Sequence, residues 1–303
     1  MKNTILILSA IAFIAGGCGQ ATQKDQKNGA KDTLQSDTSK TLITSNEVSA
    51  KRSFTINDSS YVYIKLINEK INQVKKTLAT SDASQANQLY LQTDTLLMEY
   101  VKALESMNMN WLDEYAFTVE DSLPANVKQL IAQLKECSVQ PRDIGEGMSE
   151  LVYTPFFHYN LFKDHVSKDF RDYIKIRACQ DTILFAADAG IIVPWEVVSS
   201  YAMDWETFMK KHPSSFFKDK AAEAYSFYMN VFLFGSDNTP VFDYSTQTID
   251  KDIRLVFDKF LKKYPNSNSA KILKFYLEEV KNNSGKMPDD LWEKVNKFME
   301  ELR

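Results

Sequence analysis

Apolar residues recur every three or four positions through most of the chain beyond residue 53. Between Ser60 and Leu78 they occupy Tyr61, Ile64, Ile67, Ile71, Val74 and Leu78. A second stretch with the same spacing runs from Gln85 to Met107, and Thr80-Ser81-Asp82 lies between the two. This period is typical of amphipathic helices, and the polar residues between them favour a turn followed by a helix cap. The pattern predicts a hairpin of two helices.

The rest of the chain repeats this helical period. Pro124, Ser167 and Pro194 stand where helices are expected to begin, and Gly190 and the turn cluster at 235–240 stand where they end. Further helices are expected at 121–135, 167–187, 194–211, 217–234, 249–264, 269–281 and 289–302. Only nine glycines and eight prolines interrupt the chain. We therefore expect an all-α fold of about ten helices, packed as an irregular array of hairpins.

One segment departs from the helical period. Residues 142–158 contain Gly145, Gly147 and Pro155 and show little helical spacing. Because glycine and proline interrupt helices, we expect a small non-helical insert here, with a short strand pair around 151–153. A boundary between two parts of the folded region is placed near 142–166.

Two stretches in the second half of the chain echo each other at a spacing of 52 residues. Residues 205–215 read WETFMKKHPSS, residues 257–267 read FDKFLKKYPNS, and each precedes another expected helix. The second stretch resembles the junction between tetratricopeptide (TPR) repeats of periplasmic proteins. That resemblance implies TPR-like stacking of helix pairs in the C-terminal half. The alternative is two unrelated helices that both stop at a Lys-Lys-aromatic-Pro turn.

The N-terminus has the layout of a secretory signal. Lys2 precedes an apolar run, Ile5 to Ile14, and about ten apolar residues are too few to span a bilayer, which needs roughly 20. Ala15-Gly16-Gly17-Cys18 resembles the lipobox of bacterial lipoproteins. The resemblance implies a diacylglyceryl thioether on Cys18, cleavage after Gly17 and acylation of the new amine, which anchor the protein to a lipid bilayer. An ordinary signal peptide with an incidental cysteine is the alternative.

These features divide the chain into three parts. Residues 1–17 are expected to be a lipoprotein signal peptide, residues 18–52 a lipidated cysteine and a disordered tether, and residues 53–303 a single helical domain. Residues 19–52 are polar and lack aromatic side chains, so they cannot bury enough apolar surface to fold. Gly19-Gln20 lacks the aspartate that favours inner-membrane retention in the lipoproteins it resembles. The expected location is the outer membrane, with the domain facing the periplasm.

Charge and cysteine content narrow the function. Removal of residues 1–17 leaves 35 basic and 40 acidic residues, whereas proteins that bind a phosphate backbone carry a basic surface. Nucleic-acid binding is therefore not expected. Once Cys18 is lipidated, Cys137 and Cys179 remain, and a disulfide between them would stabilise the fold by about 4 kcal/mol through chain entropy. Two separately buried thiols are the alternative.

Catalytic motifs are missing from the sequence. It contains no GxSxG, HExxH, P-loop, CxxC or dinucleotide fingerprint. We therefore expect no cofactor, assign no catalytic residue and favour a protein that is not an enzyme. The three histidines, His158, His165 and His212, lack the further ligands that zinc needs, so no metal is expected. Glu146, Glu150 and Asp188 would supply the carboxylate pair of a glycosidase if they converged. Solvated loop charges are the alternative.

The most distinctive local feature is an aromatic run at 151–162. Its rings are Tyr153, Phe156, Phe157, Tyr159 and Phe162, with His158 among them. Aromatic faces stack on sugar rings or hold apolar peptide side chains, and tyrosine and histidine add polar groups. The candidate ligand contacts are Glu146, Tyr153, Phe157, His158 and Tyr159. The alternative is that these rings fill the core beneath the insert.

Three functions follow from these patterns. Stacked helix pairs form concave surfaces that hold protein segments. The leading hypothesis is therefore a membrane-anchored envelope lipoprotein that acts as a protein-interaction adaptor or accessory subunit, with an apolar groove around 205–280 and an envelope protein as partner. The alternative is a lipoprotein that binds a glycan or a peptide through residues 151–162. The third hypothesis is a hydrolase.

Overall fold

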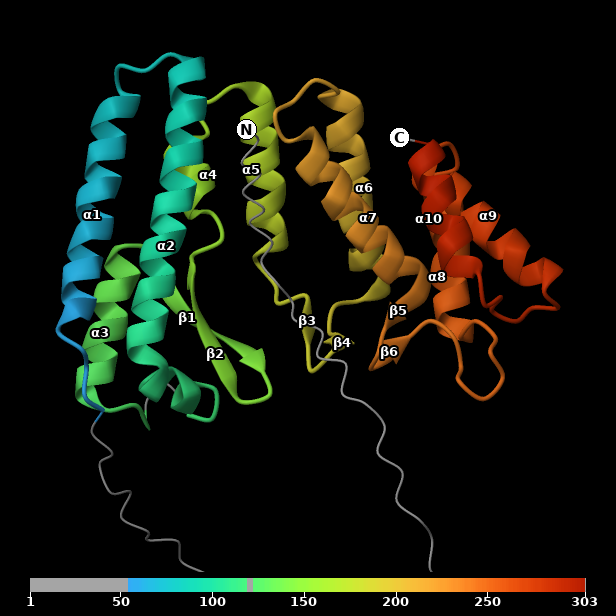
Figure 1. The fold of residues 1–303 in the computed structure, drawn as a ribbon, viewed down its shortest axis with the longest axis horizontal. Coiled ribbons are helices and arrows are strands. Elements are labelled where there is room, and N and C mark those ends of the chain that lie inside the picture. The colour runs from blue at the N-terminus through green and yellow to red at the C-terminus, as the bar shows by residue number, and fades with distance from the viewer. Residues whose placement is uncertain (1–53, 119–121, 303) are drawn as a thin grey trace, which may run out of the picture. The chain divides into compact units, whose positions relative to one another are not determined.

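The described part of the chain, residues 54–118 and 122–302 of the computed structural model, contains ten α-helices and three two-stranded antiparallel sheets (Figure 1). The helices are α1 (Ser59–Leu78), α2 (Ala83–Tyr115), α3 (Ala125–Glu136), α4 (Phe157–Phe162), α5 (Lys168–Gln180), α6 (Trp195–Lys211), α7 (Lys218–Phe234), α8 (Lys251–Lys263), α9 (Asn268–Asn282) and α10 (Leu291–Glu301). The strands are β1 (Val139–Gly145), β2 (Met148–Tyr153), β3 (Ala186–Ala187), β4 (Gly190–Ile191), β5 (Gly235–Ser236) and β6 (Thr239–Pro240). The expected all-α array of helical hairpins with a small non-helical insert is confirmed.

The N-terminal features lie outside this description. The signal peptide, Cys18 and the whole tether fall within residues 1–53, which the structure does not describe. Among the residues it does describe, no helix is both long enough and apolar enough to cross a bilayer. The lipid anchor therefore stays a prediction.

The first helical hairpin begins and turns where the sequence predicts. The Asp82 side chain accepts from the Gln85 backbone N–H at 2.8 Å, and the Gln85 side chain accepts from the Asp82 N–H at 3.0 Å, which forms a capping box. Helix α2 continues past Met107 to Tyr115, although the helical period weakens there. Trp111 and Leu112 are both fully buried, so core packing stabilises these last turns despite the weaker pattern.

The insert is a longer hairpin than the sequence predicts. Strands β1 and β2 pair from Val139 opposite Tyr153 to Gly145 opposite Met148, with an irregularity after Asp143. Pro141 lies inside β1, and a proline is tolerated there because β1 pairs on one side only within the described residues. The strand pair expected around 151–153 is therefore one end of this hairpin.

The sequence predicts one helix over residues 167–187, and this prediction is wrong for its second part. Helix α5 ends at Gln180, and residues 186–191 form the hairpin β3–β4. Asp188 and Ala189, at the turn, have φ values of 51° and 53°. Two successive left-handed residues are what a tight hairpin turn needs, so the chain turns back before Gly190.

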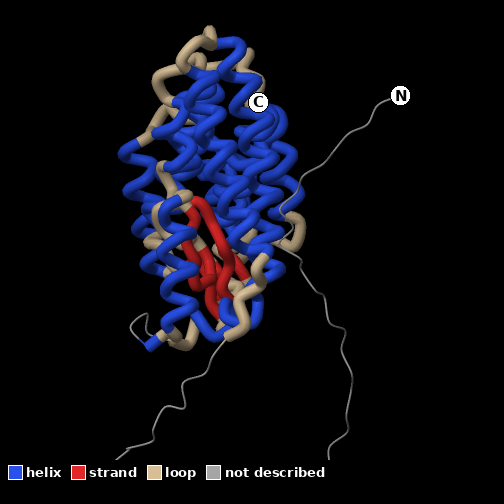
Figure 2. Tube along the Cα trace, turned by 90° about the vertical axis from the view of Figure 1, so that its left-hand side faces the viewer, coloured by secondary structure: helices blue, strands red, loops and turns tan. Residues whose placement is uncertain are grey.

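Three hairpins lie at the same side of the helices. Figure 1 places β1–β2, β3–β4 and β5–β6 along its lower half, and Figure 2 shows the strands close together in the lower half of the helical region. Strand β1 contacts β3, and β4 contacts β5. The Asn238 N–H donates to the Ala189 carbonyl at 3.2 Å, and the Ile191 N–H donates to Thr239 Oγ1 at 2.8 Å. Neighbouring hairpins are therefore held to each other as well as to their helices.

The 52-residue echo is a repeated turn. The N–H of His212 donates to the Phe208 carbonyl at 2.9 Å, and Tyr264 makes the same bond with Phe260 at the same distance. The two capping residues share similar backbone angles, φ −133° and ψ 62° for His212 against φ −126° and ψ 49° for Tyr264. Helices α6 and α8 thus end in the same way, and the His212 ring takes the place of the Tyr264 ring beside a phenylalanine.

Buried apolar side chains form two clusters. The N-terminal cluster joins Ile64, Ile67 and Ile71 of α1, α2 from Leu97 to Leu112, α3 and the β1–β2 hairpin. The C-terminal cluster joins α4 to α10 and includes Val74 and Leu78 of α1 and Ala86 and Tyr90 of α2. Because α1 and α2 contribute to both clusters, the first helical hairpin connects the two halves of the folded region.

Candidate functional site

A cavity of about 740 Å³ opens between α1, the junction of α3 with β1, and the segment that joins β2 to α4. We call it the insert groove. Helix α1 contributes Asn68, Ile71, Asn72 and Lys75, and the α3–β1 junction contributes Glu136 and Ser138. The segment from the end of β2 through α4 contributes Thr154, Pro155, Phe156, Phe157, Asn160 and Leu161. The groove is therefore lined by both apolar and polar side chains.

Local backbone geometry fixes the insert side of the groove. Ser138 adopts a left-handed φ of 62°, which turns the chain from α3 into β1. The Thr154 N–H donates to the Ser138 carbonyl at 2.8 Å, and the Phe157 N–H donates to the Thr154 carbonyl at 2.9 Å. These bonds tie the start of α4 to the end of α3, so the aromatic segment is held against a fixed support.

The helix side of the groove follows from spacing. Asn68, Ile71, Asn72 and Lys75 are three, four and seven positions apart and therefore share one face of α1. Ile71 is buried, whereas Asn72 and Lys75 are exposed. The amide groups of Asn68, Asn72 and Asn160 have no hydrogen-bond partner among the described residues. An amide side chain can both donate and accept, so these groups are available to a ligand.

The five residues expected to contact a ligand do not lie together in one site. Phe157 lines the groove and stacks on Tyr153, with ring centroids 4.8 Å apart. Tyr153 itself faces α2, where its hydroxyl donates to the Leu97 carbonyl at 3.2 Å, and burial raises its pKa. Tyr159 is half-buried against the C-terminal cluster, and Glu146 is exposed at the β1–β2 turn. Of the five, only Phe157 lines the groove.

His158 belongs to a polar cluster behind the groove. Its Nδ1 lies 2.9 Å from Asp94 Oδ1, and Asp94 Oδ2 lies 3.6 Å from Arg177 Nη1. Burial disfavours the charged form of Asp94, but the neighbouring His158 ring and the Arg177 charge outweigh it and hold the pKa of Asp94 below its usual value. The three residues come from α2, α4 and α5, so this cluster connects helices across the insert.

The three carboxylates considered for catalysis do not form an enclosed acid–base pair. Glu150 is held by Arg142 across the hairpin, with Nη2 and Oε1 2.6 Å apart. Glu146 and Asp188 are exposed at two different hairpin turns. Within residues 54–118 and 122–302, no group of three or more His, Cys, Asp or Glu side chains is arranged to hold a metal ion.

The disulfide considered between Cys137 and Cys179 is not formed. Cys137 is fully buried in the N-terminal cluster, where its thiol contacts the Leu134 carbonyl at 3.2 Å. Cys179 is exposed on α5. Both thiols are free, and the alternative of two buried thiols holds for Cys137 alone. Burial raises the pKa of Cys137 to about 11.

The sequence interpretation missed the helix side of the groove. Asn68 and Asn72 stand four positions apart on a predicted helix, which is a recognisable pattern, but nothing local shows which segment faces them. Comparisons with protein families, with curated proteins and with solved structures give no significant match. The groove is therefore the feature from which a function can be inferred.

Proposed function

We propose that this chain is a membrane-anchored envelope lipoprotein that binds a segment of a partner protein in the insert groove. The observation that carries the proposal is the groove, an open cavity of about 740 Å³ with unpartnered amide groups beside aromatic rings. This keeps the adaptor role expected from the sequence and moves its binding surface from 205–280 to the insert. The anchor at Cys18 is part of the proposal.

The lining of the groove favours a peptide over a glycan. Three asparagine amides match the donor and acceptor pattern of a peptide backbone. The rings that reach the groove are Phe156 and Phe157, and Pro155 and Leu161 flank them. The apolar rings with the flanking Pro155 and Leu161 suit an apolar peptide side chain better than the hydroxylated edge of a sugar ring. An extended peptide segment uses both kinds of lining.

Photocrosslinking in intact cells tests this function. We replace Phe156 by the photoreactive p-benzoylphenylalanine in the otherwise native, lipidated protein and identify adducts by mass spectrometry. Phe156 is 37% exposed, so the substitution keeps an aromatic ring at the mouth of the groove. The expected result is an adduct with one envelope protein, reduced at least tenfold by Asn72→Leu together with Asn160→Leu.

Two controls accompany this experiment. The same replacement at Phe216, which is 64% exposed at the start of α7, is expected to give no such adduct. Cys18→Ala is expected to remove the adduct by mislocalising the protein. Adducts with polysaccharide alone would change the ligand class to glycan, and equal adducts from both phenylalanine positions would rule out a specific groove.

A further inference from the structure

A second cluster of aromatic and acidic side chains lies away from the insert groove. It combines Phe185 of the α5–α6 connection, Tyr201 and Asp204 of α6, Phe227 and Tyr228 of α7, and Asp181 at the C-terminal cap of α5. The four rings contact one another with centroid distances between 5.1 and 6.1 Å. We call this set the aromatic–acid cluster.

Part of this cluster faces solvent although its rings are apolar. Phe227 is 45% exposed, and Ile183 and Ile192, on either side of Phe185 in the sequence, are 54% and 55% exposed. The Ile192 N–H donates to the Phe185 carbonyl at 3.1 Å, so these residues are held together. Exposed apolar side chains that lie together typically mark a binding site for a ligand or a partner protein.

Neither carboxylate of the cluster has a cationic partner. No ion pair or hydrogen bond to the side chain of Asp181 or Asp204 occurs among the described residues. Both side chains reach solvent, yet surrounding protein atoms remove enough water to raise the pKa of each carboxyl group above its usual value. Both carboxylates are therefore free to pair with an added cation.

The hydroxyl of Tyr201 gives an independent indication. Tyr201 is only 7% exposed, and its hydroxyl has no hydrogen-bond partner among the described residues. Asp204 follows Tyr201 by three positions on α6, so the two side chains share one face of that helix. Burial raises the pKa of Tyr201, and the negative charges of Asp204 and Asp181 add to this. The ring is buried and its hydroxyl is unpaired, so this hydroxyl is a further polar contact for a ligand.

We propose that the aromatic–acid cluster binds an organic ammonium group. Cations are attracted to the faces of aromatic rings, and two unpaired carboxylates supply the opposite charge. Within the described residues, the cation–aromatic contacts are those of Lys163 with Tyr159 and Lys263 with Tyr264, so no cation of the chain occupies these rings. A hard ion such as Ca²⁺ takes six to eight oxygen ligands, which this apolar setting does not provide.

The arginines that act on Asp181 do not fill this role. Arg177 acts electrostatically on Asp181, but its guanidinium group is paired with Asp94. Arg142 also acts on Asp181 and is paired with Glu150 across the hairpin. Both arginines are therefore engaged, and the surroundings stay favourable for an added cation. The site does not depend on the insert groove, so either proposal can fail without the other.

Calorimetric titration of the full lipidated chain in a neutral detergent tests the site. Choline is the probe, and 3,3-dimethylbutan-1-ol, which has the same shape without the charge, is its matched control. We expect saturable binding of choline and none of the alcohol. Asp204→Asn is expected to weaken choline binding at least fivefold, because it removes the charge and breaks no internal contact. Asp113→Asn, an exposed carboxylate on α2, is expected to change nothing.

A second arm identifies the source of the ammonium group. A short peptide with one central lysine is titrated under the same conditions. Tighter binding of the peptide than of choline assigns the site to a lysine of a protein partner, and the reverse assigns it to a free organic cation. Equal binding of choline and the neutral alcohol, no saturable binding of either cation, or unchanged binding in Asp204→Asn would overturn the proposal.

Discussion

Glu206 shows how one buried carboxylate joins helices that are distant in sequence. It is 2% exposed on α6, and its oxygens accept from the backbone N–H groups of Asn268 and Ser269 at 2.8 and 2.9 Å. The Ser269 hydroxyl and the Lys210 ammonium also donate to it. Burial disfavours its charged form, but these hydrogen bonds outweigh burial and lower the pKa of Glu206. Its negative charge lies at the N-terminus of α9, where the helix dipole favours it.

Glu206→Gln should destabilise the fold by about 1–3 kcal/mol at neutral pH, because an amide cannot accept all of these bonds. The pKa is lower in the folded state than its ordinary value of 4.5, so the carboxylate stabilises the protein above that pH. This contribution is lost as the pH falls through the folded-state pKa. Urea unfolding at pH 7 and at successively lower pH should show the two proteins converging in acid.

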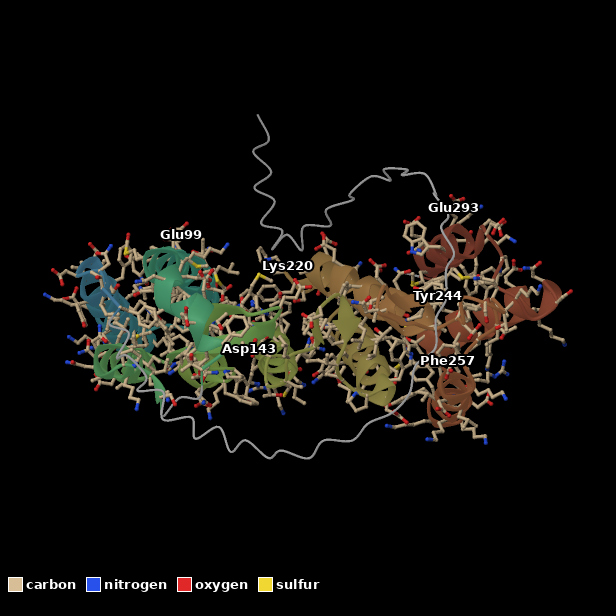
Figure 3. All side chains as sticks on the ribbon, turned by 90° about the horizontal axis from the view of Figure 1, so that it is seen from below. Glu99, Asp143, Lys220, Tyr244, Phe257 and Glu293 are labelled. Atoms are coloured by element: carbon tan, nitrogen blue, oxygen red, sulfur yellow. The ribbon has the colours of Figure 1, made fainter. Side chains whose placement is uncertain are left out.

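The control for this measurement is Glu293→Gln. Glu293 is an exposed glutamate on α10 and is labelled in Figure 3. Its replacement should change the free energy of unfolding by less than about 0.5 kcal/mol. A difference between wild type and Glu206→Gln that stays constant with pH would contradict the role assigned to the charge.

The two described cysteines should react at very different rates. Cys179 is exposed on α5, whereas Cys137 is fully buried and its pKa is raised to about 11, which leaves little thiolate at neutral pH. A maleimide added to the folded protein should therefore label Cys179 promptly and Cys137 only after unfolding. Mass spectrometry of the labelled peptides checks this, and a non-reducing digest that contains a Cys137–Cys179 peptide would contradict it.

At the scale of elements, hairpins depend on a few residues with left-handed backbone. Gly235 begins β5 with φ 80°, and a Cβ there would lie 2.2 Å from the Thr239 carbonyl oxygen. Gly285, after α9, has nearly the same φ of 81°, but a Cβ there would have nothing within 4 Å. Gly235 also has ψ −150°, a region that is open essentially to glycine alone, so a side chain at Gly235 meets both backbone strain and a steric clash.

Gly285→Ala should destabilise the protein by about 1 kcal/mol, the usual cost of a left-handed alanine. Gly235→Ala should cost clearly more, because the hairpin must also move away from the new methyl group. Thermal unfolding of both variants and wild type checks this order. Equal losses in the two variants would mean that β5–β6 adapts freely.

At the scale of the whole molecule, the first helical hairpin should couple the two apolar clusters. Helices α1 and α2 contribute to both clusters, and Asn87 of α2 exchanges two hydrogen bonds with Ser167, at 2.8 and 3.0 Å, before α5. Tyr90 of α2 packs on Phe162, Phe170 and Phe217. Unfolding one cluster would therefore remove packing from the other.

Reciprocal leucine truncations test this coupling. Leu97 of the N-terminal cluster and Leu273 of the C-terminal cluster are both fully buried, so either Leu→Ala change should cost about 2–5 kcal/mol. Hydrogen exchange of the slowest amides in α3 and in α9 should accelerate together in each variant. Acceleration confined to α3 in Leu97→Ala and to α9 in Leu273→Ala would show two independent units.

Local sequence patterns were enough to predict the features that depend on neighbouring residues. The helical period, the Asp82 cap, the helix start after Pro194 and the repeated turns after Phe208 and Phe260 are local, because a helix and its caps involve residues a few positions apart. This locality is the reason that the all-α class and most helix boundaries could be predicted. The end of α5 was not, because period alone does not show that Asp188 and Ala189 turn back.

Contacts between side chains that are distant in sequence could be read only from the folded protein. Phe156 and Asn160 face Asn68 and Asn72 across the insert groove although they are far apart in sequence, and no local pattern pairs them. The same holds for Asp94 with His158 and for the rings around Tyr201. Such contacts depend on how helices pack against one another, and packing is a property of the whole fold. The predicted lipobox is the opposite case, because it depends on four adjacent residues and not on packing.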